Sequence, residues 1–235
     1  MDTPLEKPRW GWFRIVIVYL VIFIGGPFLY QEYGTIFSYY IAYLFNQPGN
    51  PLIEFTIEYL FSFLLMAGGV SIAVLSSGAR LSNLGFVSAK PKSILIWGFG
   101  GGLIVFFLVT GFGAIIRLLN PNLAAQPVED IISQVTGVGA AVVLFICIVM
   151  QPLAEEMLFR GMIYPVMRHG IGIVWGTVAS GILFGLTHGD LWRLLPLSIG
   201  GVGLAYLFER SKTIYVPWIA HGLWNGIMAI MVLYR

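Results

Sequence analysis

The feature that most constrains this chain is a succession of long apolar stretches that carry few charges. Of the 235 residues, 58% are hydrophobic and only 10% are charged, against about 25% charged in an ordinary soluble domain. A helix that crosses a bilayer needs about 20 consecutive apolar residues. The sequence therefore predicts an all-α, polytopic transmembrane helical bundle. We expect about seven spans, at residues 12–30, 53–76, 93–119, 137–163, 171–188, 194–209 and 214–234.

One further apolar segment, Ile36–Phe45, is too short to cross a bilayer and is rich in Tyr and Phe. Because these aromatic residues favour the membrane–water interface, we expect an interfacial helix there. The sequence shows no internal repeat and no low-complexity tail. It therefore predicts a single transmembrane domain over residues 1–235, in which residues 137–234 form a motif-bearing catalytic core.

Basic residues lie before the first expected span and in alternate loops after it. Lys7 and Arg9 precede the first span, and Arg14 lies at its beginning. Because short cytoplasmic loops carry an excess of Lys and Arg, this pattern predicts a multi-pass integral membrane protein with a cytoplasmic N-terminus. The net charge of +2 argues neither for nor against nucleic acid. We expect the lipid bilayer and a membrane-associated substrate as partners, rather than nucleic acid.

Pairs of glycines four residues apart mark the faces on which helices are expected to pack. Lipid provides no hydrophobic drive for association, so transmembrane helices pack closely where small residues let their backbones approach. The glycine pairs are Gly172 and Gly176, Gly181 and Gly185, and Gly222 and Gly226.

Several ionisable or strongly polar residues lie inside the expected spans. Such groups are costly at membrane depth and by default indicate a functional interior. All of the candidates fall in the second half of the chain: Glu155, Glu156, Arg160, His188, His221 and Asn225.

The spacing of these residues assigns them different roles. Glu156 and Arg160 are four residues apart on one helix face, in the order that favours an ion pair. Glu155 points about 100° away from Glu156 and has no cationic partner nearby in sequence. It is therefore the better candidate for a general base. His221 and Asn225 share a helix face and could donate two hydrogen bonds to a developing oxyanion.

Three motifs occur in order on successive late spans: Glu155-Glu156-x-x-x-Arg160, Phe184-x-x-x-His188 and His221-x-x-x-Asn225. Together they resemble the signature of the CPBP family of intramembrane proteases. That family groups CAAX prenyl endopeptidases related to the Ras-converting enzyme with bacteriocin-processing and bacteriocin-immunity proteins. The resemblance covers about residues 155–225, whereas the first 130 residues resemble no family that we can name.

The resemblance implies an α-helical intramembrane endopeptidase that hydrolyses a peptide bond near the C-terminus of a membrane-associated substrate. A prenylated C-a-a-X sequence is the substrate that the family leads us to expect. The resemblance further implies that Glu155 and His188 activate a water. It also implies that His221 and Asn225 stabilise the oxyanion, and that Glu156 and Arg160 have a supporting role.

The requirement for a metal stays open at this point. Glu155, His188 and His221 would make a His₂Glu set of the kind that binds a catalytic zinc. Against this, the sequence has no H-E-x-x-H motif and each candidate ligand comes from a different span. If these three residues bound a zinc, Glu156 would have to act as the general base. The positive charge of Arg160 would lower the basicity of the Glu156 carboxylate. We therefore favour a metal-free glutamate mechanism over a zinc metalloprotease.

Two other classes of protein remain. A transporter also places ionisable residues at mid-membrane, but it usually shows a repeat in its two halves, and here the polar residues lie in the second half. A non-proteolytic bacteriocin-immunity or interaction protein could keep the same motifs, so the sequence does not separate it from a protease.

Overall fold

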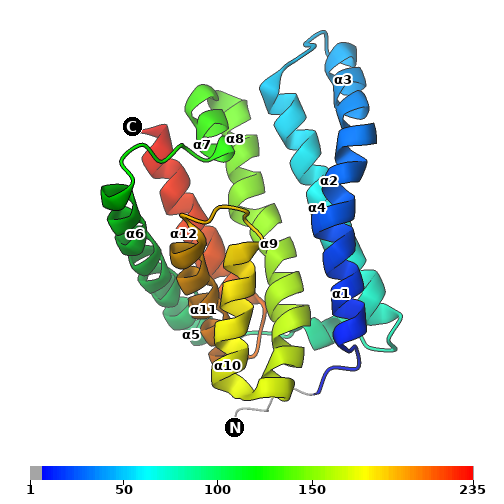
Figure 1. Ribbon diagram of the computed structural model, residues 1–235, viewed down its shortest axis with the longest axis vertical. Coiled ribbons are helices and arrows are strands. Elements are labelled where there is room, and N and C mark those ends of the chain that lie inside the picture. The colour runs from blue at the N-terminus through cyan, green and yellow to red at the C-terminus, as the bar shows by residue number, and fades with distance from the viewer. Residues whose placement is uncertain (1–6, 235) are drawn as a thin grey trace.

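The structure is a computed structural model that describes residues 7–234, and residues 1–6 and 235 lie outside it. Within the described range the chain forms helices and no β-strand (Figure 1). Short π-helical segments join several helices end to end. The α-helices are α1 (Trp12–Leu20), α2 (Gly26–Leu29), α3 (Thr35–Leu44), α4 (Pro51–Leu75), α5 (Pro91–Ser93), α6 (Gly101–Leu119), α7 (Pro127–Gln134), α8 (Gly137–Phe145), α9 (Gln151–Glu156), α10 (Tyr164–Leu186), α11 (Leu194–Ser211) and α12 (Tyr215–Leu233).

Five stretches of helix are long and apolar enough to cross a membrane: Trp12–Leu44, Pro51–Leu75, Pro91–Leu119, Gly137–Leu186 and Tyr215–Leu233. They confirm the predicted helical membrane bundle. The stretch Gly137–Leu186 is 50 residues long and contains two of the expected spans. The expected span 194–209 corresponds to α11, an 18-residue helix that is not among the five.

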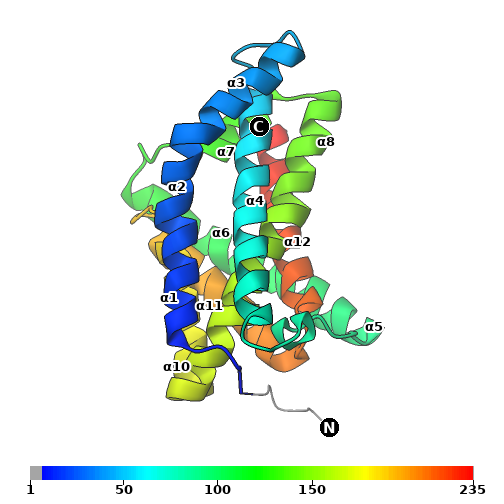
Figure 2. The same ribbon diagram turned by 90° about the vertical axis from the view of Figure 1, so that its right-hand side faces the viewer.

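The first helix differs from the expectation of a separate interfacial segment. Trp12–Leu44 is one continuous helix of 33 residues, and Ile36–Phe45 falls almost entirely in α3, its last part. The loop that separates this helix from the next follows α3, at residues 45–50. Asn50 caps the next helix by accepting a hydrogen bond from the backbone N–H of Leu52 at 2.9 Å. Figure 2 shows the first helix and α4 side by side and running in opposite directions.

The stretch Gly137–Leu186 folds back on itself at a glycine. Gly172 has φ 83° and ψ 171°, a conformation that interrupts α10 and that residues with a Cβ rarely adopt. A Cβ built on Gly176 would lie 2.8 Å from the backbone N of Arg168, so the two arms of α10 meet closely at this corner. The corner lies at the lower end of the bundle in Figure 1.

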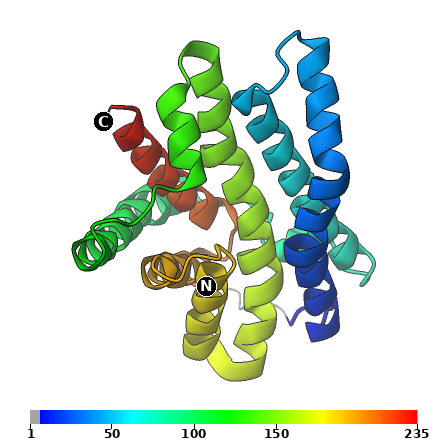
Figure 3. The same ribbon diagram turned by 45° about the horizontal axis from the view of Figure 1, so that its top comes forward.

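A central helix organises the bundle. It runs from α8 through α9 into the first arm of α10 and is continuous across its π-helical segments. The first helix and α4 lie on one side of it, and α6, α11 and α12 lie on the other (Figures 1 and 3). Residues at the middle of this helix therefore face two groups of helices at once, which is where α9 lies.

The chain enters the bundle at the end where α10 turns. Arg9 donates from Nη1 to the carbonyl oxygen of Gly78 at 2.9 Å, just after α4 ends. Trp10 donates from Nε1 to the carbonyl oxygen of Met162 at 2.8 Å. The segment before the first span thus lies at the same end as the loop after α4 and the corner of α10. A cytoplasmic location for this end stays a prediction from the charge pattern.

Glycines make the closest helix contacts, as their spacing predicts. A Cβ on Gly181 in α10 would lie 2.5 Å from the backbone N of Val202 in α11. One on Gly201 would lie 2.8 Å from the Cα of Gly181. One on Gly222 in α12 would lie 2.4 Å from the carbonyl oxygen of Ile148. No side chain fits at these points without moving a backbone.

We expect Gly181→Ala to destabilise the bundle, because its methyl group would push α10 away from α11. Overpacking of this kind costs about 1–3 kcal/mol. Gly170→Ala is the matched control, since a Cβ at Gly170 has no atom within 4 Å. Thermal unfolding of the two variants in detergent measures the difference. Equal midpoints would contradict the close contact.

Candidate active site

Two adjacent glutamates on the central helix end up in different environments. Glu155 and Glu156 are the last residues of α9, and adjacent helical positions point about 100° apart. The side chain of Glu156 is 0% exposed, whereas that of Glu155 is 23% exposed. The helix geometry therefore separates one buried carboxylate from one that reaches a cavity.

Glu156 belongs to a buried network of charges. Its Oε1 lies 3.0 Å from Nη1 of Arg160, which is also 0% exposed, so the ion pair expected from the spacing is present. Arg160 also donates from Nη2 to the carbonyl oxygen of Gly201 in α11 at 3.0 Å. Its guanidinium lies over the ring of Phe184, 4.9 Å from the centroid. Such partners are needed because an unpaired charge is very costly in a dry interior.

His221 joins the two glutamates. Its Nδ1 lies 2.9 Å from Oε1 of Glu156, and its Nε2 lies 3.6 Å from Oε2 of Glu155. Because an ionised carboxylate can only accept, Nδ1 donates to Glu156. The ring is held by Trp224, stacked with centroids 5.3 Å apart, and by Phe184 at 5.6 Å. His221 is thus fixed behind Glu155, in the core of the bundle.

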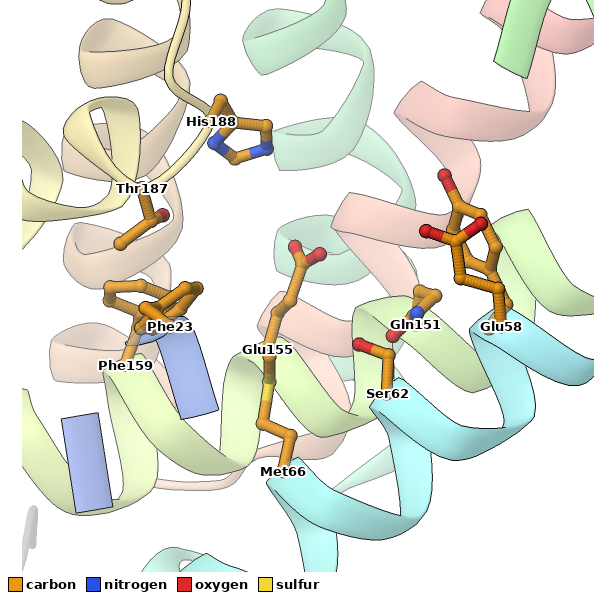
Figure 4. A pocket seen from close by; sticks show the side chains of 10 residues that line it. Phe23, Glu58, Ser62, Met66, Gln151, Glu155, Phe159, Thr187 and His188 are labelled. Atoms are coloured by element: carbon orange, nitrogen blue, oxygen red, sulfur yellow. The ribbon is translucent and has the colours of Figure 1, made fainter. Parts of the chain in front are cut away.

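A cavity of about 250 Å³ lies in front of Glu155, between α4 and the central helix. Figure 4 shows the Glu155 carboxylate projecting into it and His188 facing the same space. Two of the predicted site residues, Glu155 and His188, therefore share one cavity. The residues that line it are Phe23, Glu58, Tyr59, Ser62, Met66, Gln151, Glu155, Phe159, Thr187 and His188.

His188 follows the end of α10 and is oriented by that helix. Its Nδ1 lies 2.9 Å from the carbonyl oxygen of Phe184, one turn earlier. A carbonyl can only accept, so Nδ1 carries the proton and Nε2 is left for the cavity. In the neutral ring Nε2 accepts a hydrogen bond, and in the protonated ring it donates one. His188 can therefore both receive and return a proton.

Asp190, two residues later, does not orient His188. It forms an ion pair with Arg193 and accepts a hydrogen bond from the backbone N–H of Trp192 at 2.9 Å. Burial alone would raise the pKa of the Asp190 carboxyl, but its hydrogen bonds with Arg193 hold it below the usual value. Asp190 thus stays ionised and stabilises the turn between α10 and α11.

The hydrogen-bond partner of Asn225 could not be predicted from its four-residue spacing to His221. It lies one turn after His221 on α12, but its Nδ2 donates to the carbonyl oxygen of Cys147 at 3.0 Å. This bond joins α12 to the π-helical segment Ile146–Met150, and Asn225 is not among the residues that line the cavity. The structure therefore groups Glu155 with His188 at the cavity and leaves Asn225 behind it.

Three polar residues of the cavity, Glu58, Ser62 and Gln151, were not among the sequence candidates. The signal that points to them is again spacing. Glu58 and Ser62 lie four residues apart on α4, and Gln151 lies four residues before Glu155. Each pair therefore projects from one face of its helix.

The arrangement does not fit a three-ligand metal site. Within residues 7–234, no three His, Cys, Asp or Glu side chains form a group that could hold a metal ion. His221 donates from Nδ1 to Glu156, and its Nε2 lies 3.6 Å from Oε2 of Glu155.

We expect Arg160→Met to destabilise the protein by about 3–5 kcal/mol, because it leaves the Glu156 carboxylate buried and unpaired. Arg168→Met is the matched control, since the Arg168–Glu209 pair is partly exposed, at 14% and 11%. Unfolding by heat in detergent measures both. Adding Glu156→Gln to Arg160→Met should recover part of the loss, and equal losses for the two single variants would contradict this account of Arg160.

Comparisons with known proteins connect this geometry to a family. The family model "Type II CAAX prenyl endopeptidase Rce1-like" matches residues 137–227. The protein named "Putative membrane peptidase YdiL" of Bacillus subtilis is 27% identical over 143 residues, which are 59% of this chain and 57% of that protein. "Membrane-embedded CAAX protease MroQ" of Staphylococcus aureus is 26% identical over 157 residues, 63% of this chain and 62% of that protein.

A third relative, an uncharacterized protein of Mycoplasma capricolum, is 23% identical over 232 residues, 90% of this chain and 67% of its own length. No solved structure matches this chain. The chain spans 57% and 62% of the two relatives that carry a functional name. The matched residues 137–227 include the whole Glu155–Arg160 segment, His188, His221 and Asn225. The resemblance to the CAAX prenyl endopeptidases of the CPBP family is thereby confirmed, and it supports a membrane protease.

Proposed function

We propose that this chain is an intramembrane endopeptidase in which Glu155 acts as the general base on a water. The observation that carries the proposal is the division between the two glutamates. Glu156 is bound to Arg160 and His221 in the buried core, while Glu155 projects into a cavity that His188 also faces. A carboxylate and an imidazole that share a cavity are the groups that acid–base catalysis needs.

The hydrolysis follows from these positions. Glu155 takes a proton from a water that His188 helps to orient, and the oxygen of that water attacks the carbonyl carbon of the peptide bond. The carbonyl π-electrons move to oxygen and form an oxyanion. As the oxyanion collapses, the C–N bond breaks and the leaving nitrogen receives a proton from Glu155 or His188. His221 lies behind Glu155, with its Nε2 3.6 Å from Oε2 of that carboxylate.

To stabilise an oxyanion, as the family implies, His221 and Asn225 would have to change their hydrogen-bond partners. Asn225 would have to exchange the carbonyl of Cys147 for the substrate, and His221 would have to use its Nε2 edge. Catalytic hydrogen bonds are often formed only once substrate is bound. We therefore keep Asn225 and His221 as candidate oxyanion donors in the substrate complex.

The cavity supports a membrane-associated polypeptide as substrate. It lies between helices that are apolar enough to span a bilayer, and its lining includes Phe23, Met66 and Phe159. The family description and the name of the Staphylococcus aureus relative both specify CAAX. We accordingly propose cleavage near the C-terminus of a substrate of this kind, carrying a lipid where the host prenylates proteins.

Glu155→Gln should abolish proteolysis while the protein still inserts and purifies normally. The amide keeps the shape of the side chain but cannot take up a proton, so the loss is chemical. Asp130→Asn is the control, because Asp130 is exposed on α7 and does not line the cavity. Cleavage of a peptide library by each purified variant measures the effect. Turnover by Glu155→Gln at the wild-type rate would remove Glu155 from the mechanism.

A metal-free mechanism predicts that exhaustive treatment with a strong chelator leaves the activity near its starting level. Glu155 and His188 then supply the proton transfers themselves, and the pH profile should be bell-shaped. A known zinc protease treated in parallel shows whether chelation is complete. If chelation abolishes the activity and zinc alone restores it, the metal acts as the Lewis acid and our assignment is wrong.

A further inference from the structure

The cavity in front of Glu155 is polar at one end and apolar at the other. Its two walls carry residues at matching four-residue steps, one helical turn apart. Figure 4 shows Glu58 and Gln151 at one end, Phe159 at the other, Glu155 between them and Met66 below Glu155. The steps are Glu58, Ser62 and Met66 on α4, and Gln151, Glu155 and Phe159 on the central helix.

Gln151 shows that the polar end is built to receive a hydrogen-bond donor. The residue is only 9% exposed, and its buried Oε1 has no hydrogen-bond partner among the described residues. A buried amide oxygen is rarely left without a donor, because it loses its water and gains nothing in return. Gln151 lines the cavity, so the missing donor can come from a ligand in that space.

The charges of the cavity indicate what kind of donor this is. Two of the ten lining residues, Glu58 and Glu155, are carboxylates, and none of the ten is Lys or Arg. Within residues 7–234, Glu58 is in no ion pair. Glu58, Ser62 and the Oε1 of Gln151 together offer three acceptors at one end. A group with a positive charge and several N–H donors satisfies all three, as an ammonium or a guanidinium does.

We propose that Glu58, Ser62 and Gln151 form a specificity subsite that binds a Lys or Arg side chain of the substrate. The inference rests on the proposed function, since it takes Glu155 as the point of cleavage. Gln151 lies one helical turn from Glu155, about 6 Å along the axis, and an extended peptide advances about 3.3 Å per residue. The basic residue is therefore within about two or three residues of the scissile bond, with an apolar residue on the other side.

Binding tests the subsite without requiring turnover. The Glu155→Gln protein is placed in nanodiscs of phosphatidylcholine, which carries no net charge. The probes are short fluorescent apolar peptides that each carry one test residue, either Lys, Gln or Glu. A series of peptides places this test residue at each position in turn. At the position that meets the subsite, we expect the Lys peptide to bind about tenfold more tightly than the Gln peptide. The Glu peptide should bind more weakly than either.

Adding Glu58→Gln to this protein should bring the ratio of Lys to Gln affinities close to one. Glu54→Gln is the matched control, because Glu54 lies one turn earlier on α4 and does not line the cavity; it should keep the full ratio. Glu58→Lys should reverse the order and favour the Glu peptide. Equal binding of the three peptides at every position, or a preference that survives Glu58→Gln, would overturn the subsite.

Cleavage of the same peptides by the wild-type protein separates the two proposals. If the Lys peptide is bound preferentially but no peptide is cleaved, the endopeptidase proposal fails and the subsite stands. If the peptides are cleaved with equal kcat/KM whichever residue they carry, the subsite fails and the endopeptidase stands. Preferential cleavage of the Lys peptide that is lost in Glu58→Gln supports both.

Discussion

The ion pair between Glu156 and Arg160 is the interaction around which the helices of the second half are placed. Both side chains are fully buried, so neither charge has water as an alternative partner. Arg160 reaches α11 through the carbonyl of Gly201, and Glu156 reaches α12 through His221. A buried pair adds little net stability over apolar residues, but leaving either charge alone is severely destabilising. The pair therefore fixes the register of α11 and α12 against the central helix, because another register would lose the contacts with Gly201 and His221 that satisfy the two buried charges.

This network also explains why a dry interior holds a reactive carboxylate. With Glu156 committed to the ion pair, the next position on the helix is free to face another way. His221 connects the two, so the position of Glu155 depends on a ring that Trp224 and Phe184 hold in place. The buried core and the wall of the cavity are therefore connected through His221. In the proposed reaction, the peptide bond of the substrate meets a carboxylate whose position is set before the substrate binds.

Much of the architecture could be predicted because it depends on local sequence. The apolar stretches, the Glu156–Arg160 pair and the glycine contacts follow from helical periodicity alone. The contact of His221 with both glutamates could not be predicted, because it joins residues 65 positions apart. The bond from Asn225 to Cys147 spans 78 positions and was hidden for the same reason. The four-residue spacing of Glu58 and Ser62 indicates a shared helix face, but that this face lies opposite Gln151 could not be predicted, because Gln151 lies on another helix.

The corner at Gly172 has a consequence for how water reaches the site. The second arm of α10 ends at Leu186, and at 1.5 Å per residue it rises about 21 Å. A hydrocarbon core is about 30 Å thick, so an arm that starts at one surface ends short of the other. The non-helical backbone that follows, with His188 in it, then lies at a depth where unsatisfied peptide groups are tolerated only beside protein or water. A water that lines the cavity beside this backbone is the reactant of the proposed hydrolysis, which uses one water for every peptide bond that is cut.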